Sequence, residues 1–170
     1  MTGLPGRLGE LRARDVMTKS VIVVRQSDDV ATAVEVLKSH HITGTPVVDE
    51  TGRLVGIFSI SDVVNRDGAP SEADVDSEPF SDEAGRTASR LFDRAVAIGE
   101  EQGESTVRDR MSTTVRSVPQ DASLVDVARA MCDGHWHRVP VIDDCGALQG
   151  IISTMDVLAA VKNAADEARL

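Results

Sequence analysis

Residues 41–64 read HITGTPVVDETGRLVGIFSISDVV, and residues 135–158 read HWHRVPVIDDCGALQGIISTMDVL. In each stretch a proline opens a short apolar run, an Asp-x-x-Gly sequence follows, and a second apolar run ends in Ser-x-x-Asp. Asp at the first and Gly at the fourth position favour a type I turn between two strands. Each stretch therefore predicts a hairpin followed by a helix, and the chain contains this pattern twice.

The repeat extends toward the amino terminus. An offset of 94 residues aligns residues 14–64 with residues 108–158 without a gap, and 17 of the 51 aligned positions are identical. Self-similarity of this kind indicates a duplicated structural unit. We call residues 14–64 the first copy and residues 108–158 the second copy. A feature that only one copy carries is not required by the fold that both share.

Each copy begins with a predicted strand and helix. The β-branched runs at 21–24 and 115–118 predict short strands. Ser27 and Asp121 lie at predicted N-cap positions, and apolar residues then follow at the i, i+3, i+4, i+7 spacing of a helix with one buried face. The apolar residues are Val30, Ala33, Val34 and Leu37 in the first copy and Leu124, Val127, Ala128 and Met131 in the second. The predicted fold class is α+β (α/β-like), with two β-α-β-β-α units.

Residues 66–105 belong to neither copy and carry most of the charge. They hold 4 basic and 11 acidic side chains, a net charge of −7 out of −10 for the whole chain. Residues 66–82 are rich in Asp, Glu, Ser and Pro, which predicts a solvated linker that either contacts a partner, covers a cleft or only adds solubility. Residues 84–101 predict a short helix with an apolar face. That face comprises Leu91, Ala95, Val96 and Ile98.

The expected organisation has four parts. They are a lead-in helix over residues 1–15, a first domain over 16–65, an acidic linker with a short helix over 66–105, and a second domain with a C-terminal helix over 106–170.

The composition limits the possible environments. A chain of 170 residues that is 41% hydrophobic and 27% charged is typical of a soluble globular protein. The acidic balance argues against nucleic acid as a partner, and no apolar stretch is long enough to cross a bilayer. Cys132 and Cys145 are too few for a disulfide scaffold. We therefore expect a cytoplasmic protein with reduced thiols and no membrane partner.

The motifs of both copies resemble a tandem pair of CBS domains, also called a Bateman module. The shared pattern is x-P-V-[VI]-D, the D-x-x-G turn and the ending G-I-[FI]-S-x-x-D, and it covers about 100 of the 170 residues. The resemblance implies two units packed sheet against sheet with pseudo-twofold symmetry. It also implies clefts that bind adenosine-containing ligands such as AMP, ADP, ATP or S-adenosylmethionine.

The same resemblance implies a stand-alone regulatory protein. Such modules commonly form homodimers and pass their ligand state to an effector protein, which this sequence does not name. The nucleotide would be a regulatory ligand, no cofactor would be required, and no catalysis is expected. The alternative is a CBS module that dimerises and docks without any ligand.

The Ser-x-x-Asp endings are the first candidate ligand contacts. Ser59 and Asp62 in the first copy, like Ser153 and Asp156 in the second, lie where a strand ends and a helix begins. Unpaired N–H groups at a helix start favour a phosphate, and a carboxylate can accept hydrogen bonds from ribose hydroxyls. The alternative is a capping box, in which the acid bonds back to the helix start.

The residues before the proline differ between the copies. The second copy offers His137 and Arg138, which can bind a phosphate, whereas the first offers the uncharged Thr43 and Gly44. The alternative for Arg138 is a surface ion pair with Asp143 or Asp144.

The resemblance adds residues of the opposite copy to each set. The stronger predicted set is His137, Arg138, Ser153, Asp156, Ser20, Ile22 and Ile42, and the weaker set is Thr43, Gly44, Ser59, Asp62, Thr114, Arg116 and Trp136.

Other chemistry has little support in the sequence. Two thiols and two imidazoles could be drawn as a zinc set, namely Cys132, His135, His137 and Cys145. The repeat argues against it, since Cys132 aligns with Lys38 on a helix and Cys145 with Thr51 in a turn. A G-x-x-x-x-G-K-[ST] or H-E-x-x-H motif is also missing. We therefore expect neither a metal site nor an enzyme.

Overall fold

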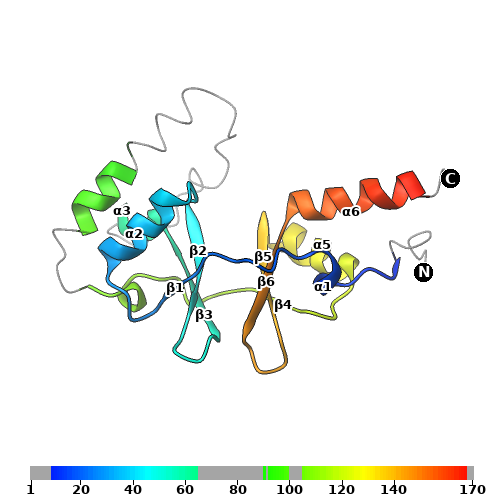
Figure 1. The fold of residues 1–170 in the computed structure, drawn as a ribbon, viewed down its shortest axis with the longest axis horizontal. Coiled ribbons are helices and arrows are strands. Elements are labelled where there is room, and N and C mark those ends of the chain that lie inside the picture. The colour runs from blue at the N-terminus through cyan, green and yellow to red at the C-terminus, as the bar shows by residue number, and fades with distance from the viewer. Residues whose placement is uncertain (1–8, 65–89, 91, 100–104, 168–170) are drawn as a thin grey trace. The chain divides into compact units, whose positions relative to one another are not determined.

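The computed structural model describes residues 9–64, 90, 92–99 and 105–167 (Figure 1). The elements of the first half are α1 (Ala13–Val16), β1 (Val24–Arg25), α2 (Val30–Ser39), β2 (Gly44–Val48), β3 (Leu54–Ser59) and α3 (Ile60–Val64). Residues 92–99 are helical, and a 3-10 turn covers Val107–Asp109. The elements of the second half are β4 (Val118–Pro119), α5 (Leu124–Gly134), β5 (Arg138–Ile142), β6 (Leu148–Ser153) and α6 (Thr154–Glu167).

Both copies form the same three-stranded sheet. The strand orders are β1-β2-β3 and β4-β5-β6, in which β1 runs parallel to β2 and β4 parallel to β5. A parallel pair needs a crossover, which α2 and α5 supply. The antiparallel pair of β5 and β6 is the predicted hairpin of the second copy. The predicted α+β class and the β-α-β-β-α order are confirmed.

The opening strands are shorter than the sequence predicts. Strand pairing begins only at Val24 and at Val118, so the predictions for residues 21–23 and 115–117 are wrong. Before Val24, the carbonyl of Ile22 accepts a hydrogen bond from the Thr45 hydroxyl and has no strand partner. The β-branched residues therefore extend beyond the strand into the segment that precedes it, so composition alone did not locate where the strand begins.

The predicted N-caps are also wrong, by two residues in each copy. Asp29 caps α2 by accepting a hydrogen bond from the Thr32 N–H at 2.7 Å, and Ser123 caps α5 through the Asp126 N–H at 3.2 Å. Ser27 instead donates to a Glu50 carboxylate oxygen at 2.9 Å. Where several Asp and Ser residues precede a helix, the pattern alone does not select the capping one.

Contacts divide the chain into two compact units, each treated separately below. The first-copy unit contains Ile22–Glu50 and the described part of Val55–Val115. The second-copy unit contains Thr51–Leu54 and the described parts of Met1–Val21 and Arg116–Leu170. The first residues of each copy therefore belong to the unit of the other copy, and we call residues 9–21 and 105–115 the lead-in segments.

Backbone pairing shows how the lead-in segments join these units. In the second-copy unit, Thr18 and Ile151 exchange two hydrogen bonds, at 2.9 and 3.0 Å. In the first-copy unit, Ser112 and Ile57 do the same, at 2.9 Å each. Position 18 aligns with position 112, and 57 with 151. The exchange is therefore the same in both copies.

A glycine on the last strand makes room for each lead-in segment. A Cβ on Gly150 would lie 2.6 Å from the Met17 sulfur and 2.9 Å from the Thr18 carbonyl oxygen. A Cβ on Gly56 would lie 2.6 Å from the Met111 sulfur and 3.0 Å from the Ser112 carbonyl oxygen. Both glycines are needed because no side chain fits between strand and lead-in.

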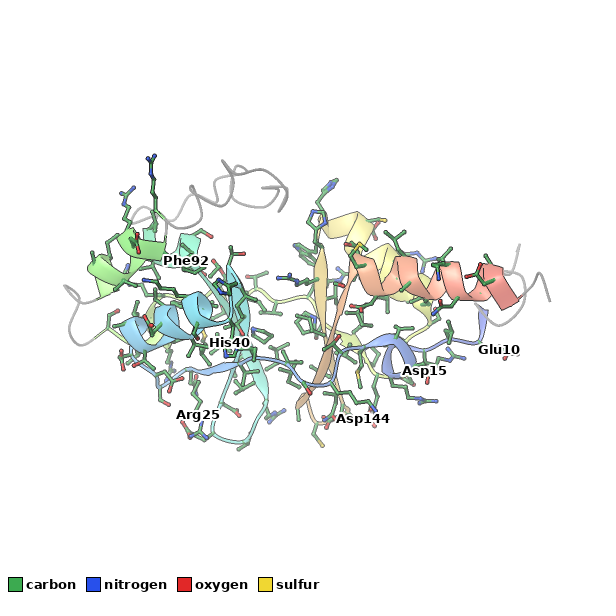
Figure 2. The ribbon with its side chains drawn as sticks, turned by 45° about the horizontal axis from the view of Figure 1, so that its top comes forward. Glu10, Asp15, Arg25, His40, Phe92 and Asp144 are labelled. Atoms are coloured by element: carbon green, nitrogen blue, oxygen red, sulfur yellow. The ribbon has the colours of Figure 1, made fainter. Side chains whose placement is uncertain are left out.

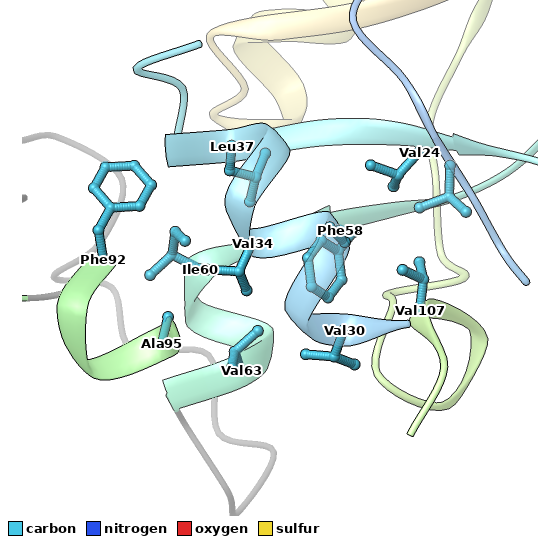
Figure 3. Close-up of a cluster of buried hydrophobic side chains, with 12 residues drawn as sticks. Val24, Val30, Val34, Leu37, Phe58, Ile60, Val63, Phe92, Ala95 and Val107 are labelled. Carbon is cyan, nitrogen blue, oxygen red and sulfur yellow. The ribbon is translucent and has the colours of Figure 1, made fainter. Parts of the chain in front are cut away.

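Each unit has its own apolar core. In the first-copy unit, buried side chains of the strands and helices surround Phe58, which is fully buried (Figure 3). In the second-copy unit, the core includes Ala13 of α1, contributed by the lead-in segment. The remaining buried members of that core are Val118, Val127, Ala130, Met131, Val139, Val141 and Ile152.

The helix formed by residues 92–99 belongs to the first-copy unit. Its Phe92 and Ala95 are buried in the core, and Lys38 of α2 forms an ion pair with Asp93 at 3.4 Å. Figure 3 shows Phe92 and Ala95 projecting toward α2 and α3. Leu91, predicted on the same apolar face, and the acidic residues 66–82 lie outside the described residues.

Candidate functional site

The residues before the proline of the second copy lie at the beginning of β5, the central strand of its sheet. Arg138 opens β5, Ser153 ends β6, and the two are direct partners in the antiparallel pair. Side chains of directly opposite residues lie on the same face of a sheet. The strand register therefore places the Arg138 guanidinium and the Ser153 hydroxyl on one side of the sheet, next to the start of α6.

Asp156 is held at the same place by its hydrogen bonds. Its Oδ2 accepts from the Ser153 N–H at 2.7 Å and from the Ser153 hydroxyl at 2.6 Å. The first copy repeats this arrangement, with both bonds from Ser59 to Asp62 at 2.7 Å. The capping arrangement is thus present in both copies.

The two carboxylates differ in their second oxygen. Asp62 Oδ1 lies 3.4 Å from the Ser112 hydroxyl, which donates to it. Among the described residues, Asp156 Oδ1 accepts no hydrogen bond, which leaves it available to a ligand hydroxyl. Thr18 occupies the position in the other copy that is equivalent to Ser112. Both residues carry a hydroxyl, but only that of Ser112 donates to the aspartate. The sequence repeat aligns Ser112 with Thr18, another hydroxyl residue. Ser112 could have been predicted as a site residue from this alignment.

Asp62 has a perturbed acidity. Burial raises the pKa of Asp62 above its ordinary value of 3.8, although hydrogen bonds from Ser59 and Ser112 act in the opposite direction. Desolvation disfavours the charged form, so an approaching hydrogen-bond donor would gain more from this carboxylate than from one in water.

The loop before β5 is fastened to the start of α6. The His137 carbonyl accepts from the Thr154 N–H at 3.0 Å, and the equivalent Thr43 carbonyl accepts from Ile60 at 2.9 Å. Both bonds hold the residue before the strand beside the first residue of the helix. His137 is exposed on this loop, next to Arg138.

The histidine that the copies share has a backbone role. His41 and His135 have φ angles of 53° and 52°, in the left-handed region after α2 and α5. Histidine is one of the few non-glycine residue types enriched in that region. Its repetition therefore follows from the helix ending. It is not a sign of ligand chemistry.

Trp136 of the weaker predicted set lies against Gly134. A Cβ on Gly134 would lie 2.7 Å from the Trp136 ring, so the absence of a side chain lets the indole cover the end of α5. The aligned first-copy residues are His40 and Ile42, and no glycine is needed there.

The surface-pair alternative for Arg138 is not what the structure contains. Asp143 Oδ1 accepts from the backbone of Cys145 and Ala147 at 2.9 Å each, and its Oδ2 accepts from Gln149 at 2.8 Å. Asp144 lies at the hairpin tip, beyond the opposite end of β5 (Figure 2). The Arg138 side chain is exposed, and its guanidinium has neither a hydrogen bond nor an ion pair with another residue that the structure describes.

The remaining predicted residues are distributed over both units. Ser20 is exposed and belongs to the same unit as Arg138, whereas Ile22 and Ile42 are half-buried in the first-copy unit. Of the weaker set, the first-copy unit holds Thr43, Gly44, Ser59, Asp62 and Thr114, and the second-copy unit holds Arg116 and Trp136.

The described residues contain neither a cluster of metal ligands nor a membrane-spanning helix. Over residues 9–64, 92–99 and 105–167, no three His, Cys, Asp or Glu side chains lie close enough together to hold a metal ion. Cys132 and Cys145 are both exposed and free. None of the described helices combines the length and apolar character needed to cross a bilayer.

Comparison with known proteins gives a family match over both copies. The sequence model of the CBS domain matches residues 13–68 and 107–163. The uncharacterized protein MJ1426 of Methanocaldococcus jannaschii is 31% identical over 157 residues, which cover 87% of this chain and 89% of that protein. The chloroplastic CBS domain-containing protein CBSX2 of Arabidopsis thaliana is 30% identical over 159 residues, 92% of this chain and 66% of that protein.

The fold matches as well. The crystal structure of CBSX2 in complex with AMP is similar to this chain with a TM-score of 0.63 and 25% identity, and the alignment covers 89% of this chain and 96% of that one.

Proposed function

This chain belongs to the CBS-domain family, and on that premise we propose that it is a regulatory module that binds an adenosine-containing ligand. AMP, ADP and ATP are the first candidates, with S-adenosylmethionine as a further one. The second-copy residues His137, Arg138, Ser153 and Asp156 form the principal contacts, supplemented by Ser20, Ile22 and Ile42. The weaker set contributes a lower-affinity site.

The register of β5 and β6 carries this proposal. It brings the Arg138 guanidinium, which has no ion pair among the described residues, opposite the Ser153 hydroxyl at the start of α6, where the helix dipole favours an anion. Arginine binds a phosphate with two parallel hydrogen bonds, and the free oxygen of Asp156 can accept from a ribose hydroxyl. A phosphate donor set and a ribose acceptor thus lie at one end of one sheet.

Two further observations support the choice of ligand. The similar protein CBSX2 has been crystallised with AMP. The first copy lacks a cation at the position of Arg138, where it has Gly44. A phosphorylated ligand is therefore expected to favour the second-copy residues, and an uncharged adenosyl group is the better candidate for Ser59 and Asp62.

Signalling requires that the ligand distinguish two states of the protein. A ligand shifts an equilibrium only by its difference in affinity for the two arrangements. In this proposal the bound nucleotide changes the affinity for an effector protein or for a second copy of the chain. The competing function, a docking module without ligand, predicts no such change.

Isothermal titration calorimetry with AMP, ADP and ATP tests the proposal. Arg138→Ala removes charge-assisted hydrogen bonds and should weaken nucleotide binding roughly tenfold or more, with a comparable loss for Asp156→Ala. Asp62→Ala is the matched control and should have a smaller effect. Melting curves establish that each variant is folded.

Two outcomes would contradict it. Absence of heat with every adenosyl compound favours the docking module. Equal affinity of wild type, Arg138→Ala and Asp62→Ala would mean that the ligand contacts other residues.

A further inference from the structure

Each lead-in segment places one methionine against the last strand of a sheet. Met17 comes directly after α1 and Met111 shortly after the 3-10 turn, at positions that the 94-residue offset aligns. Both side chains are half-buried and pack against the core of their unit. Each sulfur lies 2.6 Å from the point where a Cβ on Gly150 or Gly56 would stand. In both units a thioether therefore fills the contact between lead-in segment and strand.

The backbone holds both methionines in the same way. The Met17 N–H donates to the Ala13 carbonyl at 2.9 Å, and the Met111 N–H donates to the Val107 carbonyl at 2.8 Å. Ala13 and Val107 are aligned by the repeat and are both fully buried. One turn thus links each methionine to a buried residue of its unit.

The residue after each methionine forms the pairing with the strand. Thr18 and Ser112 each exchange two backbone hydrogen bonds with the last strand of their unit. Displacement of the methionine side chain therefore acts directly on this pairing. In the first-copy unit it also acts on Asp62, because the Ser112 hydroxyl donates to Asp62 Oδ1 at 3.4 Å.

The thioether sulfur is the reactive group at this contact. A peroxide transfers one oxygen atom to the sulfur. The O–O bond breaks, the sulfur is oxidised to a sulfoxide, and the peroxide is reduced to water or an alcohol. The contact has no room for a Cβ, and a close-packed interior does not absorb an added oxygen. A sulfoxide is also polar and gains by moving into water, so oxidation weakens the contact that holds the lead-in segment.

The other described methionines provide an internal scale. Met155 is 68% exposed and Met131 is 5% exposed, and Met17 and Met111 lie between them. Because access to the oxidant follows exposure, the two lead-in methionines are expected to oxidise after Met155 and before Met131.

We propose that Met17 and Met111 are paired oxidation sites, and that conversion of either thioether to the sulfoxide releases the lead-in segment of its unit. A dithiol restores the contact through methionine sulfoxide reductases, since it is oxidised to a disulfide while the sulfoxide oxygen leaves as water. The proposal concerns the chain without nucleotide, so its failure is separate from failure of the proposed function.

Hydrogen peroxide treatment of the full chain tests the order of oxidation. The chain carries Cys132→Ser and Cys145→Ser, because both cysteines are exposed and free and would react as well. Mass spectrometry after proteolysis should find the sulfoxide first at Met155, next at Met17 and Met111, and last at Met131.

Amide hydrogen exchange in the same background measures the release. After oxidation, the amides of Thr18 and Ser112 should exchange roughly tenfold faster or more, because local opening becomes easier. Leucine keeps the apolar volume of methionine without an oxidisable sulfur. Oxidised Met17→Leu should therefore show faster exchange only at Ser112, and oxidised Met111→Leu only at Thr18.

The double variant Met17→Leu with Met111→Leu is the matched control. It still oxidises at Met155, yet its exchange rates should stay those of the untreated protein. In the oxidised chain without leucine substitutions, both classes of sulfoxide reductase, one for each epimer, should restore slow exchange in the presence of dithiothreitol.

Three results would overturn the proposal. Met17 and Met111 that oxidise no faster than Met131 would be out of reach of the oxidant. Unchanged exchange at Thr18 and Ser112 in a chain fully oxidised at both methionines would mean that the contact tolerates the sulfoxide. A double leucine variant whose exchange accelerates equally on oxidation would assign the effect to another group.

Discussion

The first and second copies agree where the backbone sets the requirement, whereas their side chains differ both in the core, as at Phe58 and Ile152, and at outward-facing positions. Gly52 and Gly146 have φ angles of 83° and 80° in the hairpin turns, and the left-handed histidines match within one degree. Arg138 and Met155 replace Gly44 and Ser61 on the surface. Because the two copies have the same fold, these outward differences mark the positions at which ligand or partner binding can be specialised.

The largest expected effect tests a feature that both copies share. Gly56→Val and Gly150→Val should each lower the free energy of unfolding by about 3 kcal/mol, because the added side chain displaces a methionine and a backbone carbonyl of the lead-in segment. Urea denaturation measures both losses. In the Gly150→Val background, Met17→Ala should recover part of the loss by removing the closest atom. Clearly unequal losses of unfolding free energy would show that the pairing of lead-in segment and last strand stabilises only one of the two units.

The sequence predicted the elements that depend on local pattern. The hairpins, the order of elements and the helices of each copy follow from turn residues and apolar spacing, and the structure confirms them. Ser153 and Asp156 were also predicted as neighbours at a helix start, and their hydrogen bonds show that they are.

Long-range pairing was not predictable from the same pattern. Thr18 pairs with Ile151 across more than a hundred residues, and no local propensity encodes that choice. The hydrogen bond from Ser112 to Asp62 depends on the same exchange, since it requires the second lead-in segment beside the first-copy helix. The N-cap positions failed for a different reason, because neighbouring Asp and Ser residues compete for one role.

An effect of intermediate size is expected at the helix caps, where the two copies differ. The cap of α2 is Asp29, which titrates, whereas the cap of α5 is Ser123, which does not. Asp29→Ala should destabilise the protein by about 1 kcal/mol at neutral pH. Hydrogen bonds from Thr32 hold the pKa of Asp29 below its ordinary value of 3.8. The contribution of Asp29 is therefore complete above pH 3.8 and is lost as the pH falls through the lower pKa of the folded state.

Thermal unfolding as a function of pH measures this effect. The difference between wild type and Asp29→Ala should shrink below pH 3.8. Asp29→Asn keeps an effective cap without a titrating group. The stability difference between wild type and Asp29→Asn should therefore be smaller than for Asp29→Ala and should arise mainly from the lost charge. A penalty for Asp29→Ala that grows as the pH falls would contradict the assignment.

The smallest effect concerns the hydrogen bond that only the first copy has. Carbon-13 NMR should find the pKa of Asp62 above 3.8, the direction that burial imposes. Ser112→Ala should raise the pKa of Asp62 further, because the lost hydroxyl stabilises the charged form. Thr18→Ala, the aligned change, should leave it unmoved. A pKa of Asp62 below 3.8 would mean that its hydrogen bonds outweigh its burial.

The exchange of lead-in segments has a consequence for synthesis on the ribosome. The first-copy unit pairs with Ser112, so it cannot be complete until the chain has been translated well past its own last strand. Residues 11–18 are made long before their partners Ala122 and Ile151, which follow them by more than a hundred residues. A gene cut between the copies would leave each fragment without the segment that pairs with its last strand, so we expect that neither fragment forms its complete unit alone.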